Sequence, residues 1–306
     1  MFRSVPLILR PLLGIALIIS ATACARNTAE SDAHTEHAMV PPAGAVTTAV
    51  VSDASLPASA LDVGARLARS PRHGEWVMIH TGPSDSVKAW VVYPERSTKA
   101  PVVVVVHEIY GLSTWVRGVA DQLAADGYIA IAPDLLTGKV APAPGSDTLT
   151  QAAASAAIRT LQTADVHRQL AAVGQYGMSL PAAEKQYGTV GFCWGGGTSF
   201  LHAVSSPPGL GASVVYYGTS PADSLLPRVR VPVLGLYAGD DARVNATVPP
   251  AETTMRSLGK TYEPHTFAGA GHGFLRQQEG KDGANLAASR QAWPLTLAFF
   301  RTHLGR

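Results

Sequence analysis

Residues 191–197 read Gly-Phe-Cys-Trp-Gly-Gly-Gly, between a stretch with strand character at residues 187–190 and a helix-like run at residues 198–205. A glycine-rich turn that joins a strand directly to a helix, with a reactive side chain at its apex, is typical of a nucleophile elbow. The pattern therefore predicts an α/β fold in which Cys193 is a nucleophile at the end of a strand.

Two glycines flank Cys193 where such a turn has no room for a side chain. Gly191 lies two residues before it and Gly195 two residues after it. The apex residue has a strained backbone, so its neighbours at these positions must lack a Cβ atom. The N-terminus of the following helix also favours a thiolate. The alternative is that Cys193 is an ordinary small buried residue, as free cysteines often are.

Strand-like and helix-like segments alternate outward from the elbow. Residues 101–106 read Pro-Val-Val-Val-Val-Val, apolar on both faces like a central strand of a helix-covered parallel sheet. Residues 75–80 and 87–93 alternate like a hairpin around the turn at residues 82–85. Further strands are expected at residues 128–132, 212–217, 231–237 and 262–267, and helices at residues 113–126, 148–173, 248–258 and 285–303. This alternation predicts one domain, residues 71–306, with a mostly parallel sheet covered by helices on both faces.

The first 23 residues have the pattern of a signal peptide. Arg3 and Arg10 accompany an apolar run at residues 11–19, and the small residues Ala21-Thr22-Ala23 follow. The apolar run is shorter than a membrane-spanning helix requires. We therefore expect export, with the protein in the periplasm or anchored to the membrane of a bacterial envelope.

Cys24 directly follows the predicted cleavage site, and two kinds of processing fit it. Ordinary secretion would leave Cys24 unmodified, whereas a lipoprotein box would make it the site of a lipid anchor. Residues 24–70 are rich in Ala, Ser, Thr and Pro and are predicted to form a flexible linker. His34 and His37 lie in this linker, where no metal site is expected.

Charge and cysteine content exclude some classes of partner. Of 24 basic residues, the predicted signal peptide removes two and no acids, so 24 − 2 = 22 basic residues face 22 acidic ones. A nucleic-acid partner is not expected, because phosphate binding needs a basic surface. Only two cysteines are present, one at the processing site and one in the elbow, so no disulfide framework is expected.

Four segments with polar side chains directly follow predicted strands: residues 107–111, Cys193, residues 239–241 and residues 271–273. In an open α/β sheet, ligands bind beyond the carboxyl ends of the strands. We therefore expect these four segments to meet in one pocket.

Cys193, Asp241 and His272 occur in the order nucleophile, acid, base. A thiol nucleophile needs a base to take its proton, and the base needs a carboxylate that fixes its tautomer. Asp240 is the alternative acid, because either of two adjacent aspartates after a strand can instead hydrogen-bond the turn. The alternative for His272 is a histidine of a surface loop.

Four motifs together resemble the dienelactone hydrolase family over about residues 75–303: HEIYG at 107–111, GFCWGG at 191–196, GDDARV at 239–244 and GHGFLR at 271–276. The resemblance implies an α/β-hydrolase fold and hydrolysis of a small ester or lactone through Cys193, His272 and Asp241. It places the acid three residues before Val244, hence at Asp241. It implies neither a metal nor an organic cofactor.

The oxyanion of the reaction is expected to bind backbone N–H groups of Trp194, after the nucleophile, and of Ile109, in the loop after the valine strand. Glu108 stands beside this predicted oxyanion hole. The resemblance implies that Glu108 contacts the cysteine and takes part in activating it when substrate arrives. The alternative is a salt-bridged or solvent-facing loop glutamate.

The resemblance also assigns Arg276 to the carboxylate of the substrate, a task that suits a guanidinium fork. The family's second substrate-binding arginine falls in the loop at residues 136–139, where this chain has Lys139. Lys139 either replaces that contact or the contact is missing. The substrate class therefore stays open among esters and lactones, with or without a carboxylate.

Two other functions fit the same residues. The first is a broad carboxylesterase or a thiol acyltransferase on the same scaffold. The second is a catalytically silent envelope lipoprotein that binds ligands in the pocket; the joint presence of nucleophile, acid, base and glycines speaks against it.

Overall fold

The computed structural model describes residues 53–140 and 146–305. The predicted signal peptide, Cys24, His34 and His37 lie outside the described residues, as does most of the predicted linker. Within the described residues, no helix is long and apolar enough to cross a membrane.

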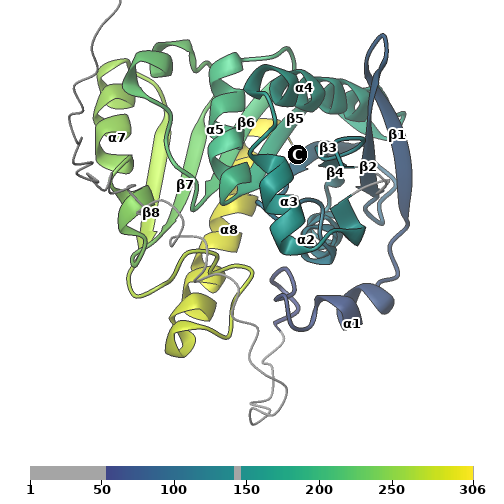
Figure 1. Cartoon of the computed structure of the whole chain (residues 1–306), viewed down its shortest axis with the longest axis horizontal. Coiled ribbons are helices and arrows are strands. Elements are labelled where there is room, and N and C mark those ends of the chain that lie inside the picture. The colour runs from purple at the N-terminus through teal and green to yellow at the C-terminus, as the bar shows by residue number, and fades with distance from the viewer. Residues whose placement is uncertain (1–52, 141–145, 306) are drawn as a thin grey trace, which may run out of the picture. The chain divides into compact units, whose positions relative to one another are not determined.

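One sheet of eight strands organises the fold, in the order β1-β2-β4-β3-β5-β6-β7-β8 (Figure 1). The first two strands and β4 pair antiparallel, and all pairs from β4 to β8 are parallel. The predicted mostly parallel sheet is therefore confirmed, as is the predicted hairpin, formed by β1 and β2. The strands are β1 (Gly74–Gly82), β2 (Asp85–Val92), β3 (Ala100–Val106), β4 (Ile129–Asp134), β5 (Ala183–Phe192), β6 (Leu210–Tyr216), β7 (Val233–Ala238) and β8 (Tyr262–Phe267).

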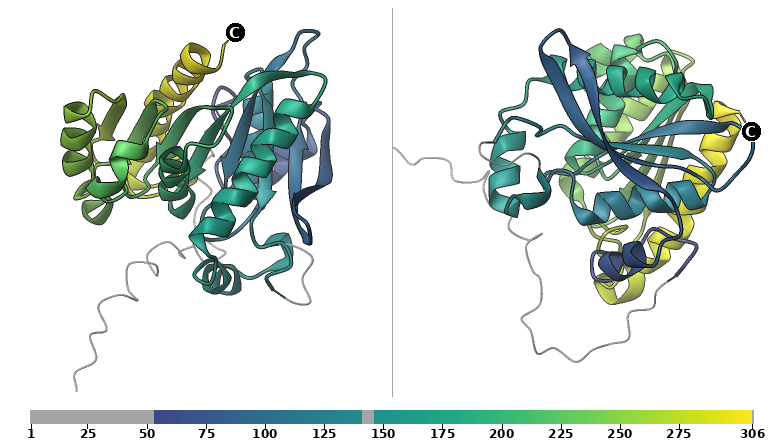
Figure 2. Two further views of the ribbon diagram at one scale, coloured as in Figure 1. Left: turned by 90° about the horizontal axis from the view of Figure 1, so that it is seen from above. Right: turned by 90° about the vertical axis from the view of Figure 1, so that its right-hand side faces the viewer.

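Helices cover both faces of the sheet (Figure 2). The helices are α1 (Val63–Ala68), α2 (Thr114–Ala125), α3 (Gln151–Ile158), α4 (Thr163–Ser179), α5 (Trp194–Ser205), α6 (Ala242–Asn245), α7 (Val248–Ser257) and α8 (Ala284–Leu304). Short 3-10 turns lie at Ser146–Thr148, Asp223–Arg228 and Lys281–Gly283. Side chains of α2 and α8 belong to the core on one face, and those of α4, α5 and α7 to the core on the other.

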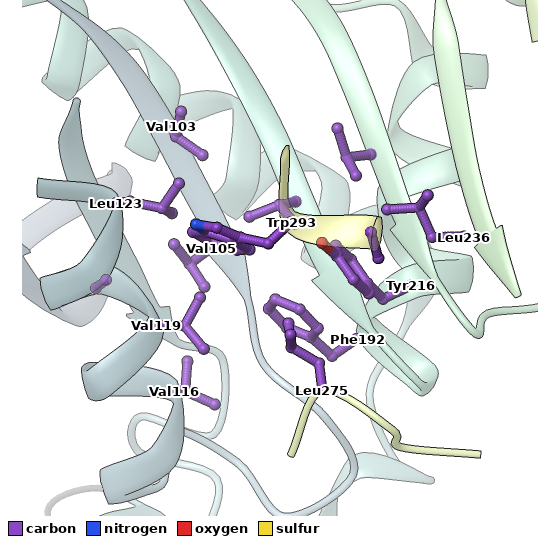
Figure 3. Packing of buried hydrophobic residues seen from close by; sticks show 14 of the residues in the cluster. Val103, Val105, Val116, Val119, Leu123, Phe192, Tyr216, Leu236, Leu275 and Trp293 are labelled. Carbon is purple, nitrogen blue, oxygen red and sulfur yellow. The ribbon is translucent and has the colours of Figure 1, made fainter. Parts of the chain in front are cut away.

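Strand β3 is fully buried because its valines serve both cores. Val103 and Val105 point to the face covered by α2 and α8, where they lie near Trp293 and Leu123 (Figure 3). Their neighbours along the strand, such as Val104, point to the opposite core. The valine run thus holds the centre of the sheet, and the strand that carries Cys193 pairs with it directly.

Residues 148–173, predicted as one helix, form the end of a 3-10 turn, α3 and the first part of α4. The break falls at residues 159–162, where Thr160 and Leu161 donate their N–H groups in tight turns and Gln162 is extended. The single-helix prediction was wrong because the two helices pack on different clusters. Helix α3 packs on Leu136, whereas α4 covers the sheet.

The predicted linker was too long at its C-terminal end. Of its residues, 53–70 are part of the packed domain: Leu56 and Val63 are buried, and the latter begins α1. Arg66 of this helix donates to the backbone oxygen of Leu56 and to the side chain of Gln122 on α2. The composition of small and polar residues suggested a linker, but a few large apolar residues anchor this segment to the domain.

Candidate active site

Cys193 has the strained backbone expected at the apex of the turn, with φ 55° and ψ −117°. A Cβ atom on Gly191 would lie 1.9 Å from the backbone oxygen of Gly195. A Cβ atom on Gly195 would lie 2.3 Å and 2.4 Å from the backbone oxygens of His107 and Val106. Both positions therefore admit only glycine, and together they force the turn between β5 and α5.

The strained turn is tied to the neighbouring strand and to its own helix. The N–H of Cys193 donates to the backbone oxygen of Tyr216 at 3.0 Å. Its carbonyl accepts the N–H groups of Gly196 and Gly197, which starts α5 immediately after the nucleophile. The positive end of this helix dipole consequently lies at Cys193, where it favours negative charge on sulfur or on a bound oxyanion.

Asp241 and His272 are brought together from the ends of two adjacent strands, β7 and β8. The Nδ1 atom of His272 lies 2.5 Å from Oδ2 of Asp241, and both side chains are largely buried. The other carboxylate oxygen of Asp241 accepts the N–H of Val244 and so caps α6. Asp240 instead forms a surface ion pair with Lys281 at 3.3 Å. Of the two candidate acids, Asp241 is the one that orients His272.

The pKa of His272 reflects two opposing influences. Burial of the imidazole lowers its pKa, but the hydrogen bond with Asp241 and the interaction with Cys193 together outweigh burial and raise the pKa of His272 to about 9. The imidazole is therefore protonated at neutral pH. A cation held between a carboxylate and a thiol stabilises the thiolate form of that thiol.

This raised pKa predicts a pH-dependent stability. A histidine whose pKa rises from 6.5 to about 9 on folding stabilises the fold fully below pH 6.5 and loses that contribution as the pH rises through 9. The contribution is on the order of 3 kcal/mol. Urea unfolding of the wild type and His272→Gln between pH 6 and pH 10 should show a stability difference that shrinks as the pH rises. A difference that is constant across this range contradicts the assignment.

Glu108 and Arg276 form a buried ion pair, with Nε of Arg276 3.0 Å from Oε1 of Glu108. The two atoms lack the alignment of a hydrogen bond, so the contact is mainly electrostatic. Burial raises the pKa of Glu108, while the positive charges of Arg276 and His272 oppose this shift. Glu108 is therefore a salt-bridged glutamate in the interior of the site rather than a solvent-facing one.

The loop after β3 is held in place by His107, which sequence reasoning did not single out. Its Nε2 atom accepts the N–H of Leu135 at 3.2 Å, so its Nδ1–H donates to the backbone oxygen of Glu108 at 2.9 Å. Its ring also stacks on Trp194. The burial of His107 lowers its pKa, in keeping with this neutral tautomer. The two segments that carry the predicted oxyanion hole are thus packed against each other.

The predicted oxyanion donors are the backbone amides of Ile109 and Trp194. Neither amide donates a hydrogen bond to another group in the described part of the chain. The Ile109 amide lies in the loop after β3, and the Trp194 amide is at the first position of α5, directly after Cys193. They are available to a carbonyl oxygen of a substrate.

Lys139 lies on the surface of the described structure. Its side chain is exposed on the loop after β4, and its N–H donates to the backbone oxygen of Leu136. Among the described residues, no hydrogen bond or ion pair joins Lys139 to Cys193 or Arg276. The contact of Lys139 with substrate stays a prediction.

Tyr217 is a second residue of the site that the sequence did not reveal. It follows β6, has a φ of 40°, and packs its ring against His272 with 5.1 Å between ring centroids. Its buried hydroxyl has no hydrogen-bond partner in residues 53–140 and 146–305. Burial, together with the nearby charges of Glu108 and Cys193, raises the pKa of Tyr217 well above its usual range. The site therefore contains an un-ionised phenol with a free donor.

No group of three or more His, Cys, Asp or Glu side chains in the described residues is arranged to hold a metal ion. The chemistry that the arrangement supports is that of a thiol activated by a histidine and a carboxylate, with two free backbone donors and a guanidinium beside it.

The chain is similar to several known proteins. Residues 87–304 match the model of the dienelactone hydrolase family. A Salmonella typhi protein with the provisional name carboxymethylenebutenolidase is 29% identical over 250 residues, which cover 72% of this chain and 85% of that protein. A Bradyrhizobium protein provisionally named 2-oxo-3-(5-oxofuran-2-ylidene)propanoate lactonase is 29% identical over 246 residues, covering 75% and 94%.

A solved structure is also similar. The crystal structure of a protein from Klebsiella pneumoniae, provisionally described as a dienelactone hydrolase, has a TM-score of 0.66 at 25% identity. The match covers 76% of this chain and 99% of that one. The α/β-hydrolase arrangement of sheet and helices is thus shared along almost the whole of that protein.

Proposed function

Because the chain belongs to the dienelactone hydrolase family, we propose that it cleaves an ester or lactone by transferring the acyl group first to Cys193 and then to water. The observation that carries the proposal is the strained Cys193 interacting with His272, whose Nδ1 atom is held by Asp241. Ester hydrolysis by the Cys193→Ala variant tests the proposal, and full retained activity would contradict it.

In the first half of the reaction, the Cys193 thiolate, which the protonated His272 stabilises, attacks the carbonyl carbon. The amides of Ile109 and Trp194 bind the oxyanion. When the carbon–oxygen bond of the ester breaks, His272 returns a proton to the leaving oxygen, and a thioester on Cys193 remains.

In the second half, His272 takes a proton from a water molecule, and the resulting hydroxide attacks the thioester carbon. The carbon–sulfur bond breaks, the carboxylic acid leaves, and Cys193 is again a thiolate beside the protonated His272. Asp241 keeps Nδ1 of the imidazole protonated throughout, so that Nε2 faces the reacting atoms.

The ion pair of Glu108 with Arg276 makes the site responsive to charge on the substrate. A substrate carboxylate competes with Glu108 for the guanidinium. Release from Arg276 removes one of the influences that hold the pKa of Glu108 down, so the buried carboxylate becomes a stronger base. A more basic Glu108 fits the activating role that the family resemblance implies.

Replacing Arg276 by alanine is expected to raise KM for a lactone that carries a carboxylate by about 10-fold to 100-fold, the effect of losing a charge-assisted hydrogen bond. KM for a neutral ester should change much less. Steady-state kinetics with one substrate of each kind measures both values. Arg256→Ala, which removes an exposed arginine of α7, is the control. Equal changes in KM for the two substrates would rule out carboxylate binding by Arg276.

We also propose that the protein is exported, on the strength of the N-terminal pattern of residues 1–23. Cell fractionation and intact mass of the chain expressed in a bacterium with an envelope should find it outside the cytoplasm, beginning at Cys24. If Cys24 carries a lipid, Cys24→Ser should release the protein from the membrane. A cytoplasmic chain that begins at Met1 contradicts the proposal.

A further inference from the structure

A cavity of about 440 Å³ lies at the corner where α1, α2 and the first two strands meet. Helix α1 packs against α2 at this corner, as the right-hand view of Figure 2 shows. The lining residues that matter here are Gly64, Leu67, Arg72, Trp90, Arg117 and Asp121. None of them belongs to the candidate active site, and the volume is in the range of small-molecule pockets.

The charged residues of one wall of the cavity, Arg72 and Asp121, are paired with each other. Arg72 donates to both carboxylate oxygens of Asp121, at 3.1 Å from Nε and 2.5 Å from its terminal nitrogen. The Ser70 hydroxyl donates to the same carboxylate at 2.5 Å. The charges of Arg72 and Asp121 thus cancel, and Asp121 has little capacity left for another cation.

Arg117 is the unpaired cation of the cavity. None of the ion pairs in the described part of the chain includes it, and the only hydrogen bond of its guanidinium there is a long one of 3.4 Å to the Thr114 hydroxyl. Its Nε–H is shielded from solvent and has no partner among those residues. The guanidinium instead faces two indoles, 5.7 Å from the ring of Trp90 and 5.8 Å from that of Trp76. A cation so placed has donors to offer an anion.

The apolar part of the cavity is built around Trp90. A Cβ atom on Gly74 would lie 2.4 Å from the ring of Trp90, so the indole takes its place only because residue 74 is glycine. The indole N–H of Trp90 is also without a partner in residues 53–140 and 146–305. Leu67 of α1 adds apolar surface. The cavity therefore combines an aromatic face with an unpaired guanidinium.

We propose that this cavity binds a small organic monocarboxylate with an aromatic body. The Arg117 guanidinium binds the carboxylate, and Trp90 and Leu67 contact the aromatic body. The site is separate from Cys193, so the proposal does not depend on the proposed hydrolysis.

The test is a calorimetric titration with 2-naphthoate of the whole chain carrying Arg276→Gln, which removes the guanidinium expected to bind carboxylates at the active site. We expect one binding site. Adding Arg117→Met should weaken binding at least tenfold. Adding Gly64→Phe should do the same while leaving Arg117 in place, because Gly64 lines the cavity and has room for a side chain that would occupy ligand space.

The controls are matched to these changes. Gly64→Ala adds only the Cβ atom, and Arg256→Gln removes an exposed cation of α7, so both should leave the affinity unchanged. With Arg276 intact, the Arg117 and Gly64 variants should hydrolyse esters at the wild-type rate. The neutral analogue 2-naphthylmethanol and inorganic phosphate should each bind at least tenfold more weakly than 2-naphthoate.

Four outcomes would overturn the proposal. They are no saturable binding of 2-naphthoate by the Arg276→Gln chain, unchanged binding in both Arg117→Met and Gly64→Phe, equal binding of the neutral analogue, and equal binding of phosphate. The first two exclude the site, the third excludes recognition of the carboxylate, and the fourth excludes recognition of the aromatic body.

Discussion

Replacing Cys193 by alanine is expected to lower kcat/KM for esters and lactones by about 10⁴-fold or more, because no acyl intermediate can form. Residual turnover should come only from the oxyanion donors and from substrate binding. The measurement is steady-state hydrolysis of p-nitrophenyl acetate and of a lactone by the wild type and the variant under identical conditions.

The fold itself should survive this substitution, since alanine keeps the Cβ atom and only the sulfur is removed. Cys193→Gly is a useful companion variant. Glycine relieves the backbone strain at φ 55°, so this variant should be inactive yet roughly 1 kcal/mol more stable than Cys193→Ala. If Cys193→Ala retains full hydrolysis, Cys193 is not the nucleophile.

Gly195→Ala is expected to have the second large effect, on both stability and activity. Its Cβ atom would lie 2.3 Å and 2.4 Å from two backbone oxygens of the β3 end, which cannot rotate away. The fold should lose about 3 kcal/mol or more, at the upper end of the cost of overpacking. The displaced β3 loop carries Ile109, so kcat should fall about 100-fold through misplacement of the oxyanion donors.

Gly64→Ala is the matched control for this prediction, because the same added atom there meets nothing within 4 Å. Chemical unfolding and ester hydrolysis of both variants give the comparison. A Gly195→Ala protein as stable and as active as Gly64→Ala would contradict the account of how the elbow is held.

The parts of the fold that were predicted correctly have strong local signals. The valine run of β3 is apolar on both faces and could serve only as a central strand. The glycines at 191 and 195 have no other reason to flank a cysteine than the close approach of two backbones, which the structure contains. Strand β8 was predicted with its exact bounds, residues 262–267.

The parts that were missed depend on tertiary contacts. No glycine or proline marks the break between α3 and α4, because it arises from packing on two different clusters. Residues 53–70 have a linker-like composition, yet Leu56 and Val63 hold them against the domain. The periodicity of a short stretch of sequence does not show which cluster a helix packs on or whether a segment is anchored to the domain.

In the active site, too, local sequence patterns predicted some features, and others depend on tertiary contacts. The chain order of Cys193, Asp241 and His272, with the family pattern at Val244, predicted which side chains meet. The pairing of Glu108 with Arg276, and the placement of Tyr217 on His272, join residues distant in the chain. His107 holds the loop after β3 through hydrogen bonds of its ring, and no sequence motif predicts these bonds. The only signal for this role was a histidine directly after a buried strand.

The central claim is that acyl transfer passes through Cys193, and the most direct measurement is a search for the thioester itself. Wild-type protein mixed with p-nitrophenyl acetate and quenched in acid within the first turnover can be digested and analysed by mass spectrometry. The account predicts one acetyl group, labile to hydroxylamine, on the peptide that contains Cys193. An acetyl group on another residue, or turnover without any acylated Cys193, would contradict it.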